Sequence, residues 1–123
     1  MHEHDPLTHS IIGCAIEVHR HLGPGLHENT YEEALCIELR AIPLEYTRQV
    51  GVPVLYKGQL IGEHRPDLVV AAKVVVEVKN IDRLTDVHQA QILAYMRILG
   101  IPVGLLMNFN SAVLRTSIRP LAI

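Results

Sequence analysis

The spacing of apolar residues along the chain predicts three helices. The first runs from about Pro6 or Thr8 to Leu22 and ends at the glycines of "GPG", residues 23–25. The second begins near Glu28 and ends before Pro43. The third covers residues 84–99, with Thr85 as a cap and Gly100 as the stop.

Between the second and third helices the period changes to that of strands. Residues 52–63 indicate a hairpin that turns at Lys57-Gly58, and residues 65–79 indicate two strands joined by a tight turn near Ala71-Ala72. A buried strand follows over 101–109, and Pro120 limits the last strand to a sheet edge. This order predicts an α/β protein, α+β-like in its antiparallel meander, with a mixed sheet, a crossover helix and helices on its faces.

Length and composition further narrow the classes of protein that fit this sequence. A chain of 123 residues with 49% hydrophobic residues is expected to form one domain, 1–123, with its own core. It has no apolar run of the roughly 20 residues needed to cross a bilayer, and "MHEHDPLTHS" is too polar for a signal peptide. We therefore expect a cytoplasmic protein. The net charge of −2 disfavours a strongly electrostatic nucleic-acid binder but not an enzyme that meets phosphate through a metal.

Two acids in the strand region stand out. In "KVVVEVKN", residues 73–80, the alternation of side chains puts Glu77 and Lys79 on one face and three valines on the other. A buried carboxylate needs a cation, and Lys79 alone could supply a simple ion pair. Asp67, however, precedes Glu77 by ten residues, so the return strand would bring the two carboxylates side by side.

Two neighbouring carboxylates repel each other unless a proton or a metal ion lies between them. Asp67, Glu77 and Glu28 contribute −3 and Lys79 adds +1, so one divalent cation would neutralise the group. Hard oxygen ligands favour Mg²⁺ or Mn²⁺, and Lys79 could hold a water molecule beside the ion. For Glu28, a favourable interaction with the helix dipole is the alternative explanation.

The third helix carries a polar residue within an apolar stripe. Val87, Tyr95 and Ile98 recur at helical spacing, with Gln91 among them. A buried glutamine needs hydrogen-bond partners, which a carboxylate, a metal-bound water or a phosphate would provide. Bonding to the backbone at the sheet edge is the alternative.

Together these residues resemble a known family. Pro66-Asp67 followed by Glu77-Val78-Lys79 is similar to the signature of the PD-(D/E)XK nuclease superfamily, and Gln91-x-x-x-Tyr95 resembles the QxxxY motif of its RecB-like branch. "GLHENTY", with Gly25, Glu28 and Tyr31, is similar to the motif of the GxxExxY protein family within that superfamily.

The resemblance implies a restriction-endonuclease-like core with a three-stranded antiparallel meander, and it implies residue roles. Asp67 and Glu77 would bind the metal with the Val78 carbonyl, Glu28 would complete the acidic site, and Lys79 would orient or activate water. His19 is a further candidate ligand. The residues expected to position substrate or support the site are Gln91, Tyr95 and Tyr31.

The expected function is metal-dependent hydrolysis of phosphodiester bonds in nucleic acid, DNA more than RNA. Backbone contacts could come from Lys57, Arg65, Arg83 and Arg97, and five aromatic residues are too few for extensive base stacking. A non-catalytic binding module with the same fold is the alternative. In either case a homodimer, formed through an edge strand or a helix face, is a candidate assembly, and no membrane partner is expected.

Overall fold

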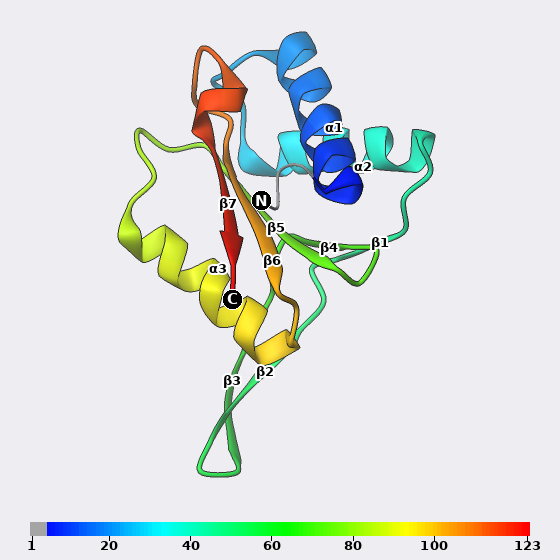
Figure 1. Cartoon of the computed structure of the whole chain (residues 1–123). Coiled ribbons are helices and arrows are strands. Elements are labelled where there is room, and N and C mark those ends of the chain that lie inside the picture. Colours follow the sequence, from blue (N-terminus) through cyan, green and yellow to red (C-terminus); the bar gives the residue numbers. More distant parts are fainter. Residues whose placement is uncertain (1–4) are drawn as a thin grey trace.

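The computed structural model describes residues 5–123, whose helices and strands follow the predicted order with one additional strand, Tyr46–Arg48 (Figure 1). The helices are α1 (Pro6–Leu22), α2 (Glu28–Ala41) and α3 (Asp86–Leu99), with a 3-10 turn η2 (Leu114–Ser117). The strands are β1 (Tyr46–Arg48), β2 (Val52–Tyr56), β3 (Gln59–His64), β4 (Leu68–Val70), β5 (Val74–Lys79), β6 (Val103–Asn108) and β7 (Ile118–Ala122). Within this described part, no helix has the length and apolar character needed to cross a membrane.

Five strands form one mixed sheet in the order β1-β4-β5-β6-β7. The β5–β6 pair is parallel and the other pairs are antiparallel, so α3 is the crossover between β5 and β6. Pro120 lies in β7, at the edge of the sheet, where its missing N–H costs no ladder bond. The predicted α/β class with a mixed sheet is confirmed.

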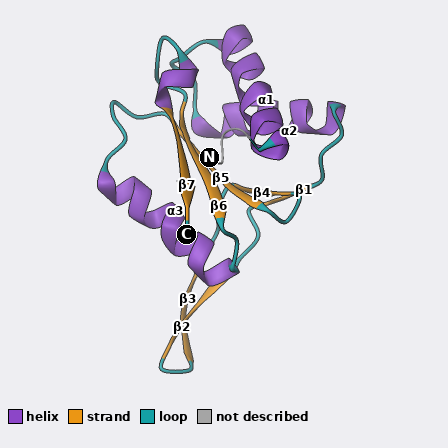
Figure 2. Cartoon of the chain, in the orientation of Figure 1, coloured by secondary structure: helices purple, strands orange, loops and turns teal. Residues whose placement is uncertain are grey.

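Helices cover both faces of the sheet (Figure 2). Alternate residues of β5 belong to two different cores: Val74, Val76 and Val78 pack with α1 and α2. Val75 packs on the other face with Ile92 and Met96 of α3. Glu77 shares the face of Val75, so its carboxylate lies on the α3 side of the sheet.

The antiparallel part of the sheet differs in detail from the expected meander. Its three strands are β1, β4 and β5, while the predicted hairpin, β2–β3, forms a separate two-stranded sheet inserted between β1 and β4. Strand β1 was not predicted, because three residues are too few to show an alternating pattern. Figure 1 shows the hairpin projecting away from the rest of the molecule.

The buried stripe of α3 is not the predicted one. Val87 is 76% exposed and Ile98 is 47% exposed, and Gln91 is exposed as well. The buried residues of the helix are Ile92, Tyr95 and Met96. The prediction was wrong because spacings of three and four fit two adjacent stripes, and packing on β5 and β6 selected the other one.

Both predicted tight turns use left-handed backbone. Lys57 and Gly58 have φ of 50° and 79°, and Ala71 and Ala72 have φ of 53° and 56°. Consecutive left-handed residues are the geometry that matches the twist of a hairpin. The alanine pair adopts it without glycine, and Lys73 N closes the turn onto Val70 O at 3.0 Å. The turn fixes the register that aligns β4 with β5.

Close packing of α3 on the sheet depends on Gly104 in β6. A Cβ atom at this position would lie 2.6 Å from Met96 Sδ and 3.1 Å from Ile92 Cδ1, and both side chains are fully buried. Gly13 in α1 differs, since a Cβ there would meet nothing within 4 Å.

We expect Gly104→Ala to destabilise the fold by about 1–3 kcal/mol, because the added methyl group overpacks the α3 interface. Gly13→Ala is the matched control and should stabilise the fold by about 0.5–1 kcal/mol, since alanine is the better helix former. Urea denaturation of both variants measures the two changes. Equal effects would contradict the close packing at Gly104.

Candidate active site

Asp67 and Glu77 face each other across the β4–β5 pair. The register that pairs Leu68 with Val76 places Asp67 opposite Glu77. Asp67 N donates to Glu77 Oε1 at 2.9 Å, and Val78 N donates to Asp67 Oδ2 at 2.7 Å. Each carboxylate is therefore held by the backbone of the other strand, which fixes both in position.

Both carboxylates are buried at a cost. Glu77 is 4% exposed, and this burial, together with the negative charge of Asp67, raises the pKa of Glu77 to about 8. Burial also raises the pKa of Asp67 to about 6, although the hydrogen bond from Val78 N acts in the opposite direction. The protein surroundings thus supply too little solvation and positive charge to keep both carboxyls ionised near neutral pH.

Lys79 does not remove this surplus. Its Nζ lies 4.0 Å from Glu77 Oε2, longer than the 2.7–2.9 Å typical of a charge-assisted hydrogen bond. The lysine lowers the pKa of Glu77, but burial and Asp67 outweigh it. A simple Glu77–Lys79 ion pair therefore does not account for the buried acids.

Glu32 in α2 is a third acid beside the pair, which the sequence reasoning missed. Its carboxylate is 3% exposed and accepts a hydrogen bond from Arg48 Nε. Its charge contributes to the raised pKa of Asp67. A signal was present, because Glu32 follows Glu28 by one helical turn and shares its face.

Gln49 joins Glu32 to Asp67. Its Nε2 donates to Glu32 Oε1 at 3.0 Å and to Asp67 Oδ1 at 3.2 Å. Gln49 follows the end of β1 and has a φ of 55°, a left-handed conformation uncommon for a residue other than glycine. Nothing in the local sequence marks this residue, because its role depends on three segments meeting at the end of β1.

The comparison with known families agrees with this geometry. A family model described as the PD-(D/E)XK nuclease superfamily matches residues 5–121. The chain belongs to this superfamily. No curated protein and no solved structure matches it. Proteins of the PD-(D/E)XK superfamily are generally metal-dependent nucleases, and the three helices and five-stranded mixed sheet are consistent with its restriction-endonuclease-like core.

Glu28 and Tyr31, to which the resemblance gives roles in the site, make hydrogen bonds that hold the α1–α2 loop. Glu28 Oε2 accepts a hydrogen bond from Asn80 N at 2.9 Å, just beyond β5. Tyr31 is fully buried, and its hydroxyl donates to Gly23 O at 2.5 Å and accepts from Leu26 N at 3.1 Å. The Tyr31 bonds tie the α1–α2 loop to α2, and Asn80 Nδ2, which donates to Leu26 O at 2.6 Å, ties the loop to the end of β5. Complete burial of Tyr31 does not fit direct contact with substrate.

Tyr95 and Gln91 lie on the side of α3 nearest the acids. Tyr95 is 6% exposed, and burial raises its pKa, with the charges of Glu77 and Asp67 adding to the rise. Gln91 lowers the pKa of Tyr95 through a side-chain hydrogen bond. Because Gln91 itself is exposed, it is accessible to a substrate that approaches the acids.

His19 lies on the other side of the sheet. Its ring is 6.2 Å from the Phe109 ring, within the core formed by α1 and α2. Glu77 points to the α3 face, so the position of His19 does not favour a shared metal. Among residues 5–123, His19 Nε2 is buried and has no hydrogen-bond partner.

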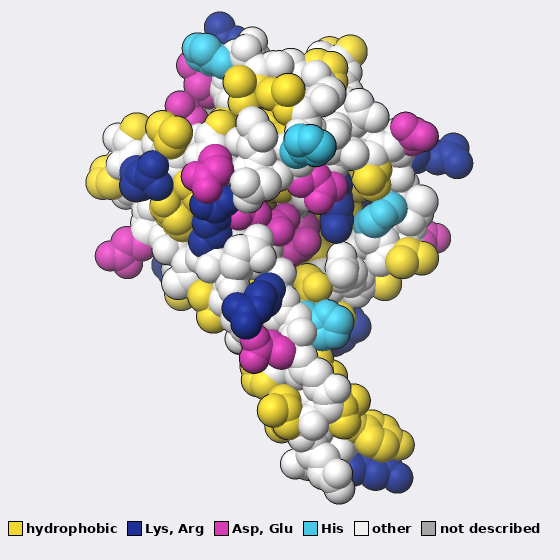
Figure 3. All heavy atoms as spheres, turned by 180° about the vertical axis from the view of Figure 1, so that it is seen from behind, with side chains coloured by type: hydrophobic (Ala, Val, Ile, Leu, Met, Phe, Trp, Pro, Cys, Tyr) yellow, Lys and Arg dark blue, Asp and Glu magenta, His cyan; other side chains and the backbone are white. Residues whose placement is uncertain are grey.

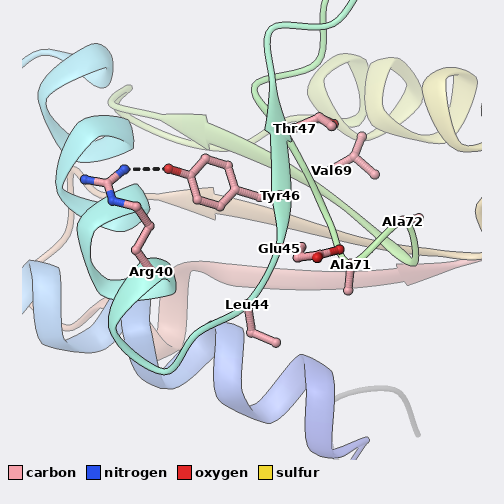
Figure 4. Close-up of a pocket in the computed structure, with 8 residues that line it drawn as sticks. All are labelled: Arg40, Leu44, Glu45, Tyr46, Thr47, Val69, Ala71 and Ala72. Carbon is pink, nitrogen blue, oxygen red and sulfur yellow. Dashed lines mark hydrogen bonds between the residues drawn. The ribbon is translucent and has the colours of Figure 1, made fainter.

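The acids do not line the large pocket near β1. That pocket has a volume of about 670 Å³ and lies along the free edge of β1 (Figure 4). Its lining includes Leu44, Tyr46 and Val69, and Arg40 Nη1 donates to Tyr46 Oη at 2.5 Å. We assign the site by its charges instead. In Figure 3 acidic side chains gather at the centre of one face, with Lys and Arg side chains close by.

Asp67, Glu77 and the Val78 carbonyl suit a divalent ion by chemistry, because two carboxylates with unrelieved charge supply hard oxygen ligands. Among residues 5–123, no group of three or more His, Cys, Asp or Glu side chains is arranged to hold a metal ion. A ligand set of two carboxylates and one backbone carbonyl is not such a group, because only two of its ligands are side chains.

The raised pKa values predict how stability depends on pH. When the folded-state pKa lies above the unfolded value, the stabilising contribution is complete below the unfolded pKa and is lost as pH rises through the folded pKa. For Glu77 this window runs from about 4.5 to about 8. We expect Glu77→Gln in EDTA to exceed the wild type in unfolding free energy by more than about 1 kcal/mol near pH 8.5.

The difference in unfolding free energy between Glu77→Gln and the wild type should shrink towards about pH 5, where folded Glu77 is protonated. Urea denaturation at both pH values measures it. Glu45→Gln, at an exposed position, is the control and should give the same small offset at each pH. A pH-independent effect of Glu77→Gln would contradict the raised pKa.

Proposed function

We propose that this protein is a divalent-metal-dependent nuclease that cleaves phosphodiester bonds, with DNA as the first candidate substrate. The observation that carries the proposal is the Asp67–Glu77 pair, which is buried side by side with raised pKa values and has Lys79 Nζ nearby, 4.0 Å from Glu77 Oε2. Two buried carboxyls lower the stability of the fold, so a structural role does not explain them. A role in metal-dependent catalysis does.

The roles follow from positions. Asp67 and Glu77 would hold Mg²⁺ or Mn²⁺ with the Val78 carbonyl, and the bound ion would lower the pKa of a water and offset phosphate charge. Lys79, 19% exposed, would orient the attacking water. Gln91 and Tyr95 would contact or support substrate from α3. On the α2 side, contacts favour Glu32 over Glu28 as the third acid.

The motifs also support placing this protein in a particular family within the superfamily. Glu28 and Tyr31 of "GLHENTY", and Gln91 with Tyr95, fit the GxxExxY family of the RecB-like branch. In this protein the first motif would act by holding the α1–α2 loop against the end of β5. It would thereby position the backbone on which Lys79 stands.

Cleavage assays test the proposal directly. With Mg²⁺ or Mn²⁺, we expect wild-type protein to cleave DNA, and Asp67→Asn and Lys79→Met each to lower the rate by at least about 100-fold. Lys73→Met is the control for Lys79→Met, and Glu45→Gln is the control for Asp67→Asn. Lys73 precedes β5 and Glu45 precedes β1, at the strand ends opposite the acids, so both variants should retain wild-type rates. Single-stranded DNA, double-stranded DNA and RNA should be compared in parallel.

Activity that survives both site substitutions would indicate contamination. No cleavage of any nucleic acid, with metal binding retained, would favour a non-catalytic binding module that keeps the nuclease fold. These outcomes separate the two functions without assuming the substrate.

Metal uptake provides an independent readout. By calorimetry, we expect Mn²⁺ affinity to rise as pH increases from about 6 to about 8.5, because the carboxylates must lose protons before they bind metal. Asp67→Asn and Glu77→Gln should abolish the binding, and Glu45→Gln should leave it intact. Equal affinity at both pH values, or binding that survives Asp67→Asn, would place any metal elsewhere.

A further inference from the structure

The β2–β3 hairpin, residues 52–64, is a fixed arm; we call it the arm below. Its base is anchored, since Val52 is 1% exposed and the His64 ring lies 6.0 Å from the Tyr95 ring of α3. Arg65 Nη1 donates to Gln49 O at 3.0 Å, which fastens the end of β3 to the segment before β2. The arm therefore leaves the body in a defined direction.

The outer part of the arm is apolar and uncovered. Leu55, Tyr56, Leu60 and Ile61 are 60–68% exposed. Leu55 is paired with Leu60, so the two side chains share one face. Tyr56 follows Leu55 in the strand and points to the opposite face. Apolar side chains thus stand on both faces, and Figure 3 shows them along the projecting arm.

The charge of the arm argues against nucleic acid as its main partner. Between residues 52 and 64 the only Lys, Arg, Asp or Glu side chains are Lys57 and Glu63, so these charges cancel. Lys57 Nζ also lies 5.4 Å from the centre of the Tyr56 ring. A β-ribbon that follows a nucleic-acid backbone needs several cations. A partner that is itself apolar fits this surface better.

The size of the patch fits association of two copies. The four side chains expose on the order of 500 Å² of apolar surface, as large as the patches that mark interaction sites. Because these side chains stand on both faces, two arms reach about 1,000 Å², the lower limit for a specific interface, when each arm covers both faces of the other. A two-fold arrangement needs a patch that is complementary to itself, and an apolar surface with few charges meets that condition.

We propose that the arm is a dimerisation element that packs against the arm of a second copy of this chain. Glu63 at the base is already paired with Arg65, whose Nη2 donates to Glu63 Oε1 at 2.6 Å, so the contact between two arms would depend on their apolar side chains. The register shift between Val54 and Leu55 interrupts the β-ladder, which favours packing through side chains over pairing of strand edges. The inference rests on the arm alone and is independent of the proposed nuclease function.

Sedimentation equilibrium of the full chain in EDTA, without nucleic acid, tests the proposal. We expect wild-type protein to form dimers reversibly over the micromolar range. Combining Leu55→Lys with Leu60→Lys should weaken dimerisation at least about tenfold, because it places like charges at the centre of the interface. Val87→Lys, at a position 76% exposed on α3, is the matched control and should dimerise as the wild type does.

Circular dichroism and thermal unfolding check that each variant folds. A wild-type protein that stays monomeric at the highest concentration overturns the proposal, as does a double variant that dimerises normally. If the wild type is monomeric and the double variant changes nucleic-acid binding instead, the arm serves the substrate. Salt separates the two modes, because apolar association persists at high salt while phosphate contacts weaken.

Discussion

The mutual hold between Asp67 and Glu77 is the constraint on which the site depends. Each carboxylate accepts a backbone N–H from the opposite strand, so the β4–β5 register and the positions of the acids are set by the same bonds. If β4 slipped by one residue along β5, Asp67 would move to the face opposite Glu77. The left-handed turn at Ala71-Ala72 is therefore part of the site, because it sets that register.

The burial of Asp67 and Glu77 lowers the stability of the fold and places two carboxyls where they could bind a metal ion. The fold keeps two carboxylates in an environment that disfavours their charge, and their pKa values rise to about 6 and about 8 as a result. The valine face of β5 packs against α1 and α2, which holds the strand that carries Glu77 in place. Natural proteins accept unfavourable local choices mainly at functional sites, and this pair fits that pattern.

Two segments outside the five-stranded sheet, the α1–α2 loop and the arm, are attached close to the acids. The α1–α2 loop is tied to α2 through Tyr31, and the start of α2 is tied to the end of β5 through Glu28. The arm begins and ends beside Gln49 and Asp67, so its base borders the site while its apolar tip extends away from it. A partner bound at the tip would thus be rigidly placed relative to the acids.

The sequence by itself determined the three helices, both tight turns and the pairing of Asp67 with Glu77, because periodicity and strand alternation are local properties. It also carried the motifs by which the superfamily is identified. Only the tertiary structure decided that β2–β3 leaves the sheet, that Ile92 and Met96 replace Val87 and Ile98 as the buried residues of α3, and that Glu32 approaches Asp67 while Glu28 holds a loop. These outcomes depend on which elements pack together across the chain, and contacts between distant segments leave no periodic trace in the sequence.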